Sequence, residues 1–509
     1  MKSLKGLLIY PPNQLMGVET PRPDGSLGLL YLGSSLEKKG IETDILDASV
    51  GFSSQNLEET FYRNIKQENG LTRIGMSFKE IADYVTKGEY DFVGINSNFT
   101  SQTTMALETA KAIKKADKKI KVYAGGVNAR VLKERFLATG YFNGVCLTEG
   151  ELVFPRMVYA DFSGKTLHNV PGVAFNYKGG IVKIPVDESC FPENLDSLPM
   201  PAWEKLPFNK YEEISSPHGV DVTGKENYKY APIMTSRGCK FKCLYCHISE
   251  EKKDSVFGFI GKLRIHSIER VVEEVDKLKS LGVEKLFFED DSLLAKKERV
   301  KEIFKVVKSK KMLISNVNGV NLIDFYTKSK DKKWKMDIEY LEILNYAGFE
   351  QIVFPAESGS QRILDKYASG KVRLDKMNLP LLMKNLTDLG IKAPVNMMIG
   401  FPDETEKEMQ ESIGLAKELM NAGAPYVTFF MPIPFPGSRL YDVAIKEGHL
   451  NKDFDTDLMN WKRPIMKNTI VPPERIEEIR DKANEEINTK EHLEKRLKQS
   501  MGFRWKSNI

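Results

Sequence analysis

The chain has 509 residues, 41% hydrophobic and 28% charged, so it can bury a large core and is expected to divide into two or three domains. Its 75 basic residues are nearly balanced by 70 acidic ones, and the lack of a long Lys/Arg run argues against nucleic acid as a partner. No run of about 18 apolar residues predicts a transmembrane segment, and the first residues are too weakly apolar for a signal peptide. We therefore expect a cytoplasmic protein without disulfides, whose five cysteines stay reduced.

The first 151 residues alternate between two kinds of pattern. Helical spacing of apolar residues is found, for example, in 27–40 and 101–119. Short runs rich in β-branched residues predict strands at 5–10, 42–47, 91–96, 120–124 and 143–147. Such alternation predicts a parallel sheet covered by helices on both faces, with ligands at the carboxyl ends of the strands.

Three loops at those strand ends are unusual. Gly125 and Gly126 would let a large flat ligand approach the backbone, and Ser97 and Thr100 offer hydroxyls one strand away. The first loop, 11–28, is long and rich in Pro and Gly. Taken alone, these features also fit tight turns and a helix N-cap.

The spacing of the loops resembles that of cobalamin-binding domains. Ser97 to Phe99 stand where such domains have Ser-x-Leu, and Gly125-Gly126 match their Gly-Gly element. The "TEGE" segment at 148–151 resembles an acidic turn that closes this domain in one enzyme family. The resemblance implies a Rossmann-like cobalamin-binding domain over 1–151. The residues that we expect at cobalamin are Asn13, Gly28, Ser97, Asn98, Phe99, Thr100, Gly125, Gly126, Val127, Asn128, Glu149, Gly150 and Glu151.

One feature departs from that pattern. Many cobalamin domains carry an Asp-x-His-x-x-Gly loop whose histidine binds cobalt from below. Here the first histidine of the chain is His168. No imidazole from 1–167 can therefore ligate cobalt, and the lower face is expected to be open, water-bound or held by another group.

Residues 152–230 are expected to form a linker. Residues 177–186 predict a hairpin, and 193–207 are Pro-rich and extended. From 231 the alternation of strand and helix resumes. The predicted strands are 231–236, 283–290, 312–319, 349–357, 393–400 and 424–432. Six such units predict a partial (β/α)6 TIM barrel over 231–440, with its chemistry at the carboxyl ends of the strands.

Three cysteines, Cys239, Cys243 and Cys246, follow the first barrel strand, and His247 comes directly after them. The Cys-x-x-Cys-His pattern suits covalent haem, but such haem is assembled on exported proteins. Zinc is a second possibility, although the adjacent Cys246 and His247 would chelate one ion awkwardly and no second Cys/His pair follows. The third, which we favour, is a [4Fe–4S] cluster held by three thiolates with one iron left open.

The C-x-x-x-C-x-x-C spacing, with Tyr245 before the last cysteine, resembles the signature of the radical S-adenosylmethionine (SAM) superfamily. The resemblance implies that the open iron binds SAM, which is then cleaved to a 5'-deoxyadenosyl radical. Four later segments resemble the parts that receive the ammonium, ribose and adenine of SAM. The residues implied to bind SAM are Tyr245, Glu289, Asp290, Asp291, Glu357, Ser358, Arg362, Ile399, Gly400, Met431 and Pro432.

Plainer explanations exist for several of these residues. The acidic segment could be a helix N-terminus, and Arg362 could pair with the SAM carboxylate or cap a helix. Ile399 and Met431, like most apolar strand residues, could be ordinary core.

Together, the domains resemble the cobalamin-binding radical SAM enzymes, chiefly class B methyltransferases. This implies methyl transfer from methylcobalamin to an unactivated carbon after the 5'-deoxyadenosyl radical has abstracted hydrogen. The alternatives are a cyclase or rearrangement enzyme without methyl transfer and a non-catalytic cobalamin or Fe–S sensor. A methylthiotransferase is disfavoured, because only Cys146 is present in the first domain. The implied partners are a substrate of unknown class (small molecule, lipid or protein side chain) and a low-potential electron donor such as ferredoxin or flavodoxin.

The last region, 441–509, is helical by pattern. Its final fifteen residues carry five Lys and Arg without an acid, which we interpret as a solvated surface helix.

Overall fold

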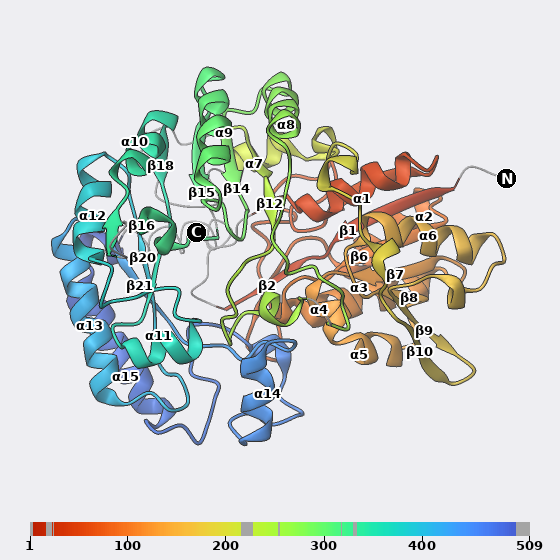
Figure 1. The fold of residues 1–509 in the computed structure, drawn as a ribbon. Helices are drawn as coiled ribbons and strands as arrows, with labels where there is room; N and C mark the ends of the chain where they lie inside the picture. Colours follow the sequence, from red (N-terminus) through yellow and green to blue (C-terminus); the bar gives the residue numbers. More distant parts are fainter. Residues whose placement is uncertain are drawn as a thin grey trace.

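The structure is a computed structural model that describes residues 4–16, 23, 25–214, 228–252, 255–316, 318–328 and 333–494. The basic segment at 495–509 lies outside the described residues. Figure 1 shows an N-terminal half, coloured red to orange, beside a second half coloured green to blue.

Five parallel strands form most of the first sheet and confirm the predicted runs. The strand order β10-β9-β8-β7-β6-β1-β3 places β1 between β6 and β3, so the chain leaves β1 in one direction and later returns to its other side. Such a switch point opens a crevice at the strand ends, here beyond Tyr10 and Asn96. The five strands are β1 (Lys5–Tyr10), β3 (Glu42–Asp47), β6 (Phe92–Asn96), β7 (Lys121–Gly125) and β8 (Gly144–Cys146).

Alternation along β1 divides the core between the two faces of this sheet. Leu7 and Ile9 pack with α2 and α3, whereas Leu8 packs with α1 and α6. Successive side chains of a strand point to opposite faces, which accounts for the division. The helices of the first half are α1 (Leu27–Glu37), α2 (Phe78–Lys87), α3 (Thr103–Ala116), α4 (Val127–Val131), α5 (Lys133–Ala138) and α6 (Gly150–Phe162).

A hairpin assigned to the linker by its sequence belongs to this sheet instead. β9 (Val173–Tyr177) pairs antiparallel with β8, and β10 (Gly180–Ile184) closes that edge. Burial of Val173, Ala174 and Phe175 favours this placement over an exposed hairpin. We therefore propose that the first domain extends beyond 151 to about Ile184. A small antiparallel sheet that the sequence did not predict contains β2 (Asn13–Leu15), β4 (Ile65–Lys66) and β5 (Thr72–Ile74).

The second half is the predicted partial barrel. Its fourth strand is split in two at Ile352 and Val353, and the single bridge between Gln351 and Lys392 spans the break. Neighbouring strands on each side of the break are parallel. The strands are β11 (Tyr230–Ile233), β14 (Lys285–Phe288), β15 (Leu313–Asn316), β18 (Phe349–Gln351), β19 (Phe354–Glu357), β20 (Val395–Met398) and β21 (Val427–Phe430).

Helices cover the outside of these strands (Figure 1). They are α8 (Ile268–Ser280), α9 (Lys297–Ser309), α10 (Ile338–Ala347), α11 (Gln361–Tyr367), α12 (Leu379–Asp388) and α13 (Glu406–Asn421). Two short hairpins stand at the carboxyl ends of the strands: β12 (Ser236–Arg237) with β13 (Arg264–Ile265), and β16 (Tyr326–Lys328) with β17 (Trp334–Met336). The rest of the helices are α7 (Phe208–Ile214) in the linker and α14 (Arg439–Lys446) and α15 (Pro473–Ile487) after the barrel.

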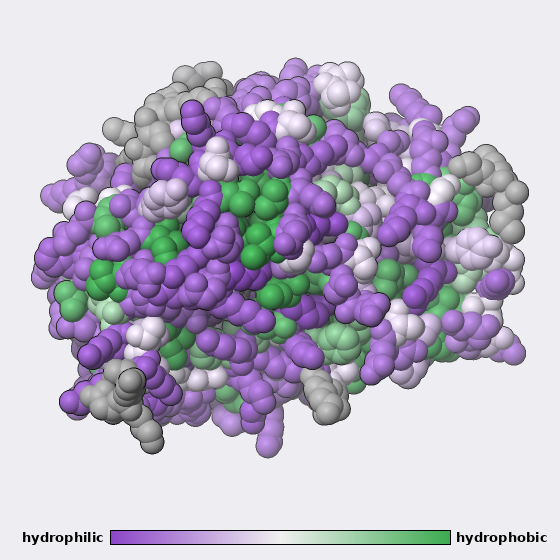
Figure 2. All heavy atoms as spheres, turned by 45° about the horizontal axis from the view of Figure 1, so that its top comes forward, coloured by the Kyte–Doolittle hydropathy of each residue, from purple (hydrophilic) through white to green (hydrophobic). Residues whose placement is uncertain are grey.

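The face drawn in Figure 2 is mostly hydrophilic, and its apolar residues form separate small patches. In the described part of the chain, no helix combines the length and the apolar character needed to cross a membrane.

Candidate functional site

A cavity of 620 Å³ lies where the two halves meet. The first sheet contributes Tyr10 and Asn96, at the ends of the two strands that flank its switch point. The barrel contributes Arg237 and Gly238, which directly precede the cysteine loop, and Asp291, which follows β14. The cavity therefore connects the loops predicted for cobalamin with those predicted for the cluster and SAM.

Most of the residues predicted for cobalamin line this cavity. They are Gly28, Asn98, Phe99, Gly125, Gly126, Val127, Glu149, Gly150 and Glu151. Four others do not line it. Ser97, Thr100 and Asn128 are buried behind it, where Asn128 Nδ2 donates to Ser97 Oγ at 2.8 Å, and Asn13 lies in β2. We infer that these side chains hold the loops in place rather than contact a ligand.

Gly126 is the position where the loop requires glycine. Its φ is +103°, and a Cβ there would lie 2.4 Å from Asn98 Oδ1 and 2.6 Å from the Ser97 carbonyl oxygen. The absence of a side chain lets the loops after β6 and β7 come together at the cavity wall.

The cavity also reaches inward between the sheet and the helices α1 and α6. Leu8 and Tyr123 line it from the sheet, and Leu29 and Phe154 line it from the helices. Gly94 widens the path, since a Cβ there would meet Leu8 at 2.8 Å and Phe154 at 3.0 Å. An apolar slot of this kind fits a planar group that extends from a larger ligand, as the nucleotide tail of cobalamin does.

The cysteine loop is fixed by its backbone. Cys239 N donates to Gly261 O at 3.1 Å, Leu244 N donates to Tyr367 O at 2.8 Å, and Lys252 Nζ donates to the carbonyls of Cys239 and Phe241 at 2.7 Å. Burial raises the pKa of Cys243, and it raises that of Cys246 to about 12; the charges of the neighbouring thiols add to both shifts. The ammonium of Lys371 opposes the shift at Cys243.

Within the described ranges, no three His, Cys, Asp or Glu side chains form a closed metal site. The donor chemistry nevertheless fits an iron–sulfur cluster, because the three free thiols stand on one loop, which Lys252 Nζ holds by the carbonyls of Cys239 and Phe241. We assign the ligand role of Cys239, Cys243 and Cys246 from their spacing and this chemistry.

The three acidic residues predicted for the SAM ammonium occupy different environments in the structure. Glu289 and Asp291 line the cavity, and burial raises the pKa of Asp291 to about 6. Asp290 instead points into the protein, where it accepts bonds from Thr235 N, Thr235 Oγ1 and Ser236 Oγ at 2.6–3.1 Å. Asp290 thus joins β14 to the segment that precedes the cysteine loop.

Glu357 ends β19 with a φ of +67°, a strained backbone conformation for a residue with a side chain. Its carboxylate pairs with Lys371 Nζ at 2.7 Å, a partner that the sequence did not suggest. Burial opposes the charge of Lys371, but the Glu357 carboxylate outweighs it and the pKa of Lys371 is raised. Burial and the nearby Glu357 charge raise the pKa of Tyr245 as well. The Glu357–Lys371 ion pair and the Tyr245 hydroxyl therefore form one polar cluster beside Cys243.

Ser358 and Arg362, the next two residues predicted for SAM, make hydrogen bonds with other side chains of the protein. Ser358 is buried and its hydroxyl lies 3.1 Å from that of Ser412. Arg362 donates to Glu408 Oε1 and Oε2 and to Asp403 Oδ2, each at 2.7 Å. This geometry favours the structural alternative for Arg362 over a contact with SAM.

The last four predicted residues lie at the ends of β20 and β21. Ile399 N donates to Phe430 O at 3.1 Å, and Met431 N donates to Trp461 O at 2.9 Å. Ile399, Gly400, Met431 and Pro432 are all buried. Gly400 has a φ of +99° and donates to Glu404 Oε2 at 2.7 Å. These contacts fix Ile399, Gly400 and Met431 in the protein interior, and none of the four residues lines the cavity.

Ion pairs between the two halves surround the cavity, and no sequence pattern predicts them because their partners are far apart in the chain. Arg237 pairs with Glu151 at 2.7 Å and with Glu149 at 3.3 Å, and Arg264 donates to Glu149 at 2.7 Å. These three pairs join the start of α6 to the hairpin that carries the cysteine loop.

A further contact between the halves places a histidine in the cavity. Arg130 of α4 donates from Nε to Glu251 Oε1 at 2.9 Å. His247, which lines the cavity, lies with Nε2 4.0 Å from Glu251 Oε2. The cavity thus contains an imidazole that comes from the barrel, although 1–167 contain none.

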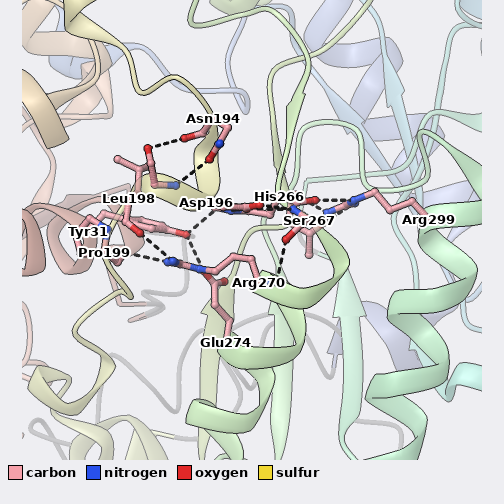
Figure 3. A network of polar contacts seen from close by, with 12 residues as sticks. Tyr31, Asn194, Asp196, Leu198, Pro199, His266, Ser267, Arg270, Glu274 and Arg299 are labelled. Carbon is pink, nitrogen blue, oxygen red and sulfur yellow. Dashed lines mark hydrogen bonds and ion pairs between the residues drawn. The ribbon is translucent and has the colours of Figure 1, made fainter.

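A buried polar network secures the linker (Figure 3). Tyr31 of α1 donates to Glu274 Oε1 at 3.2 Å and lies 3.4 Å from His266 Nε2. His266 Nδ1 lies 2.9 Å from Asp196 Oδ1 in the linker. Arg270 donates to Glu274 and to the Leu198 and Pro199 carbonyls. Because the Tyr31 ring also lines the cavity, the network couples the cavity wall to α8.

Comparisons with known proteins agree with this architecture. Residues 23–158 match the B12 binding domain, and residues 233–416 match the radical SAM superfamily. An uncharacterized methyltransferase of Pyrococcus horikoshii is 28% identical over 95% of this chain and 92% of its own. Cytidylyl-2-hydroxyethylphosphonate methyltransferase of Streptomyces wedmorensis is 27% identical over 96% of this chain and 90% of its own.

The fold also resembles that of a solved structure. The radical SAM methyltransferase TsrM of Kitasatospora setae, solved with cobalamin and a [4Fe–4S] cluster bound, matches with a TM-score of 0.60 and 16% identity over 87% of this chain and 78% of its own. The chain therefore belongs to the cobalamin-binding radical SAM enzymes, whose cofactors are a [4Fe–4S] cluster, SAM and cobalamin, and both relatives named above are called methyltransferases.

Proposed function

We propose that this protein is a C-methyltransferase that moves a methyl group from methylcobalamin to an unactivated carbon after a 5'-deoxyadenosyl radical has removed hydrogen from that carbon. When bound, cobalamin supplies the methyl group, and SAM with the cluster supplies the radical. The observation that carries the proposal is the single cavity in which Phe99 and Gly126 face Gly238 and Asp291. Two reactive centres have to reach one substrate carbon, and a shared cavity supports this.

We assign the following roles to the residues of the chain at the SAM side. Cys239, Cys243 and Cys246 would hold the cluster, and Glu289 and Asp291 would receive the SAM ammonium, since both line the cavity. Glu357 would accept hydrogen bonds from the ribose hydroxyls. Its backbone is strained, and its carboxylate pairs with Lys371.

At the cobalamin side, Gly125 and Gly126 would let the corrin approach the backbone, and the slot between Leu8 and Phe154 would take the nucleotide tail. Glu149 and Glu151 are occupied by Arg237 and Arg264, so we propose that they position the domains rather than bind cobalamin.

Radical SAM chemistry also needs a reductant and a substrate. We propose a ferredoxin or flavodoxin as the low-potential electron donor. The first substrate to test is cytidylyl-2-hydroxyethylphosphonate, the compound in the name of the Streptomyces relative.

The experiment is anaerobic reconstitution with iron, sulfide and cobalamin, followed by incubation with a reductant and SAM that carries a deuterated methyl group. We expect the deuterated methyl to reach cobalamin and, once a substrate is supplied, 5'-deoxyadenosine to be released and the methyl to reach a substrate carbon. Release of deoxyadenosine with conversion of substrate but no methyl label would favour a cyclase or rearrangement enzyme instead. SAM binding without any cleavage would favour a sensor.

A further inference from the structure

A second cavity of 350 Å³ lies in the barrel, outside the first. It is lined by Lys240 of the cysteine loop and by segments that follow β14 and β15, so it lies at the same carboxyl-terminal end of the strands. The second cavity is distinguished by the charged side chains in its walls. Its walls carry the four ammonium groups of Lys240, Lys296, Lys297 and Lys328 against the two carboxylates of Asp324 and Asp337.

Among the residues that the structure describes, two of these lysines have an acidic partner. Lys240 pairs with Asp324 at 3.1 Å, and Lys297 pairs with Asp337 at 2.6 Å. Lys296 and Lys328 make no ion pair with any residue that the structure describes. Lys328 is exposed, and its Nζ lies 5.7 Å from the centre of the Trp334 ring, within reach of a cation–π contact.

Lys296 stands in an unfavourable place. It immediately precedes α9, a 13-residue helix, and its φ is +66°, in the left-handed region that side chains rarely adopt. The N-terminus of a helix carries partial positive charge, so a cation there is repelled and an anion is attracted. The acid of the first turn, Glu298, pairs with Lys301, and the side chain of Lys296 is exposed. An anion bound here would be attracted both by the Lys296 ammonium and by the helix N-terminus.

The cavity also holds a buried acceptor. Asp324 uses one carboxylate oxygen for Lys240, whereas its Oδ2 is buried without a hydrogen-bond partner among the described residues. A buried oxygen of this kind favours a ligand that brings a hydroxyl or amino donor. The ligand chemistry is therefore an anionic group together with a hydrogen-bond donor.

Two chain segments connect this cavity to the first. After β14, Asp291 lines the first cavity and Leu294 the second; after β15, Asn318 lines the first and Ile323 the second. Three residues of extended chain span at most about 11 Å, so the two cavities lie within reach of one small molecule.

We propose that this cavity is the subsite that anchors the anionic end of the substrate, a phosphoryl, phosphonate or carboxylate group next to a hydroxyl or amine, while the carbon to be methylated extends into the first cavity. The inference rests on the proposed function, for which it names the substrate class. The lysines that carry it are Lys296 and Lys328.

The test measures binding of three probes to the anaerobically reconstituted holoenzyme by calorimetry. Ribose 5-phosphate and gluconate carry a phosphate and a carboxylate beside hydroxyls, and ribose carries neither. We expect ribose 5-phosphate to bind at least about tenfold more tightly than ribose. The double variant K296G/K328A should lose at least about tenfold of that affinity, and its glycine suits the backbone at 296. The control is Lys305→Ala, which removes an exposed lysine of the same helix, and it should bind within about twofold of the unmodified protein.

Gluconate that binds as tightly as ribose 5-phosphate supports the site with a carboxylate as its anion. The proposal is overturned if ribose 5-phosphate binds no better than ribose, or if K296G/K328A binds it like the unmodified protein. Transfer of the deuterated methyl from SAM to reduced cobalamin, which needs no substrate, is measured in parallel. If that transfer is missing while the lysine-dependent binding is present, the proposed function fails but the anion site stands.

Discussion

The guanidinium of Arg237 lies 2.7 Å from the carboxylate of Glu151, and this contact joins the two halves of the protein at the cavity. Arg237 stands two residues before Cys239, and Glu151 lies in the first turn of α6, next to the loop predicted for cobalamin. The same guanidinium reaches Glu149 at 3.3 Å. The cysteine loop and the cobalamin loops are therefore fixed to one another by charge.

Arg237→Ala should destabilise the protein strongly. All three side chains of this cluster are at least 88% buried, because the exposed fractions of Arg237, Glu149 and Glu151 are 12%, 11% and 8%. Removing the guanidinium leaves two carboxylates with less compensation, a loss that costs about 3–5 kcal/mol of unfolding free energy at buried pairs. Urea unfolding of the reconstituted protein measures it.

The matched control is Arg475→Ala. Arg475 also pairs with a glutamate, Glu406, but both side chains are more than 40% exposed. Such a pair contributes about 0–1 kcal/mol. Equal losses in the two variants would show that the Arg237 cluster does not hold the halves together.

Gly126→Ala should abolish cobalamin binding. The new methyl would collide with Asn98 Oδ1 and the Ser97 carbonyl, so the loops after β6 and β7 would have to separate. Gly140→Ala is the control, since Gly140 also has a positive φ, of +70°, but a Cβ there meets no atom within 4 Å. Cobalamin bound after gel filtration, read from its visible absorption, should fall only in Gly126→Ala. Full retention there would remove this loop from the cobalamin site.

Cys243→Ala should lose the iron–sulfur cluster and the cleavage of SAM, because three thiolates are needed to hold it. Cys190→Ala removes a buried thiol in the first half of the molecule and should keep both. Iron analysis of the oxygen-protected proteins separates the two. Iron content and SAM cleavage that survive in Cys243→Ala would refute the ligand assignment.

The positions of the strands along the chain were accessible from the sequence because they depend on local patterns. The runs at 5–10 and 42–47 became β1 and β3 with the same bounds, since an apolar run of β-branched residues has few other ways to be buried. The glycines of the Gly125-Gly126 element were equally readable, because a backbone at φ +103° depends on one residue type.

Side-chain partners were not accessible in this way. Asp290 and Asp291 are adjacent in the chain, yet one accepts bonds from Thr235 and Ser236 and the other lines the cavity. Their difference arises from which face of the strand end each carboxylate occupies once β11 and β14 have paired. The partners of Arg362, Glu408 and Asp403, lie more than 40 residues away and were equally hidden.

His266→Gln should flatten the acid side of the stability profile. Burial lowers the pKa of His266 to about 4, and the charges of Arg237 and Arg270 act in the same direction, against Asp196. In the unfolded chain, histidine takes up a proton near pH 6.5. The folded protein resists this proton, so its stability is complete above pH 6.5 and falls as the pH drops toward 4, by up to about 3 kcal/mol.

The other groups that face His266 have to be separated from this effect. Glu274, whose pKa burial raises, gives a slope of opposite sign, while Tyr31 and Arg299 keep their protonation state over this range. The measurement is therefore the difference in unfolding free energy between His266→Gln and the unmodified protein at pH 5 and pH 7. The deficit of the variant should be smaller at pH 5; a pH-independent difference would contradict the burial of a neutral imidazole.

Glu404→Gln should stabilise the protein increasingly as the pH rises. Burial raises the pKa of Glu404 to about 8, although Gly400 N and Phe401 N donate to its Oε2, and its Oε1 has no hydrogen-bond partner among the described residues. In the unfolded chain this carboxyl ionises near pH 4.5. The folded state holds the extra proton between these values, so its stability is greatest below pH 4.5 and is lost as the pH rises through 8, by about 1.4 kcal/mol per pH unit.

The glutamine keeps an acceptor for both N–H groups without this loss, and its advantage over glutamate should grow by about 2–3 kcal/mol from pH 5 to pH 7. Thermal or urea unfolding at the two pH values measures it, with the exposed Glu406→Gln as the control expected to show no such growth; a constant difference for Glu404→Gln would mean that the buried carboxyl is already ionised.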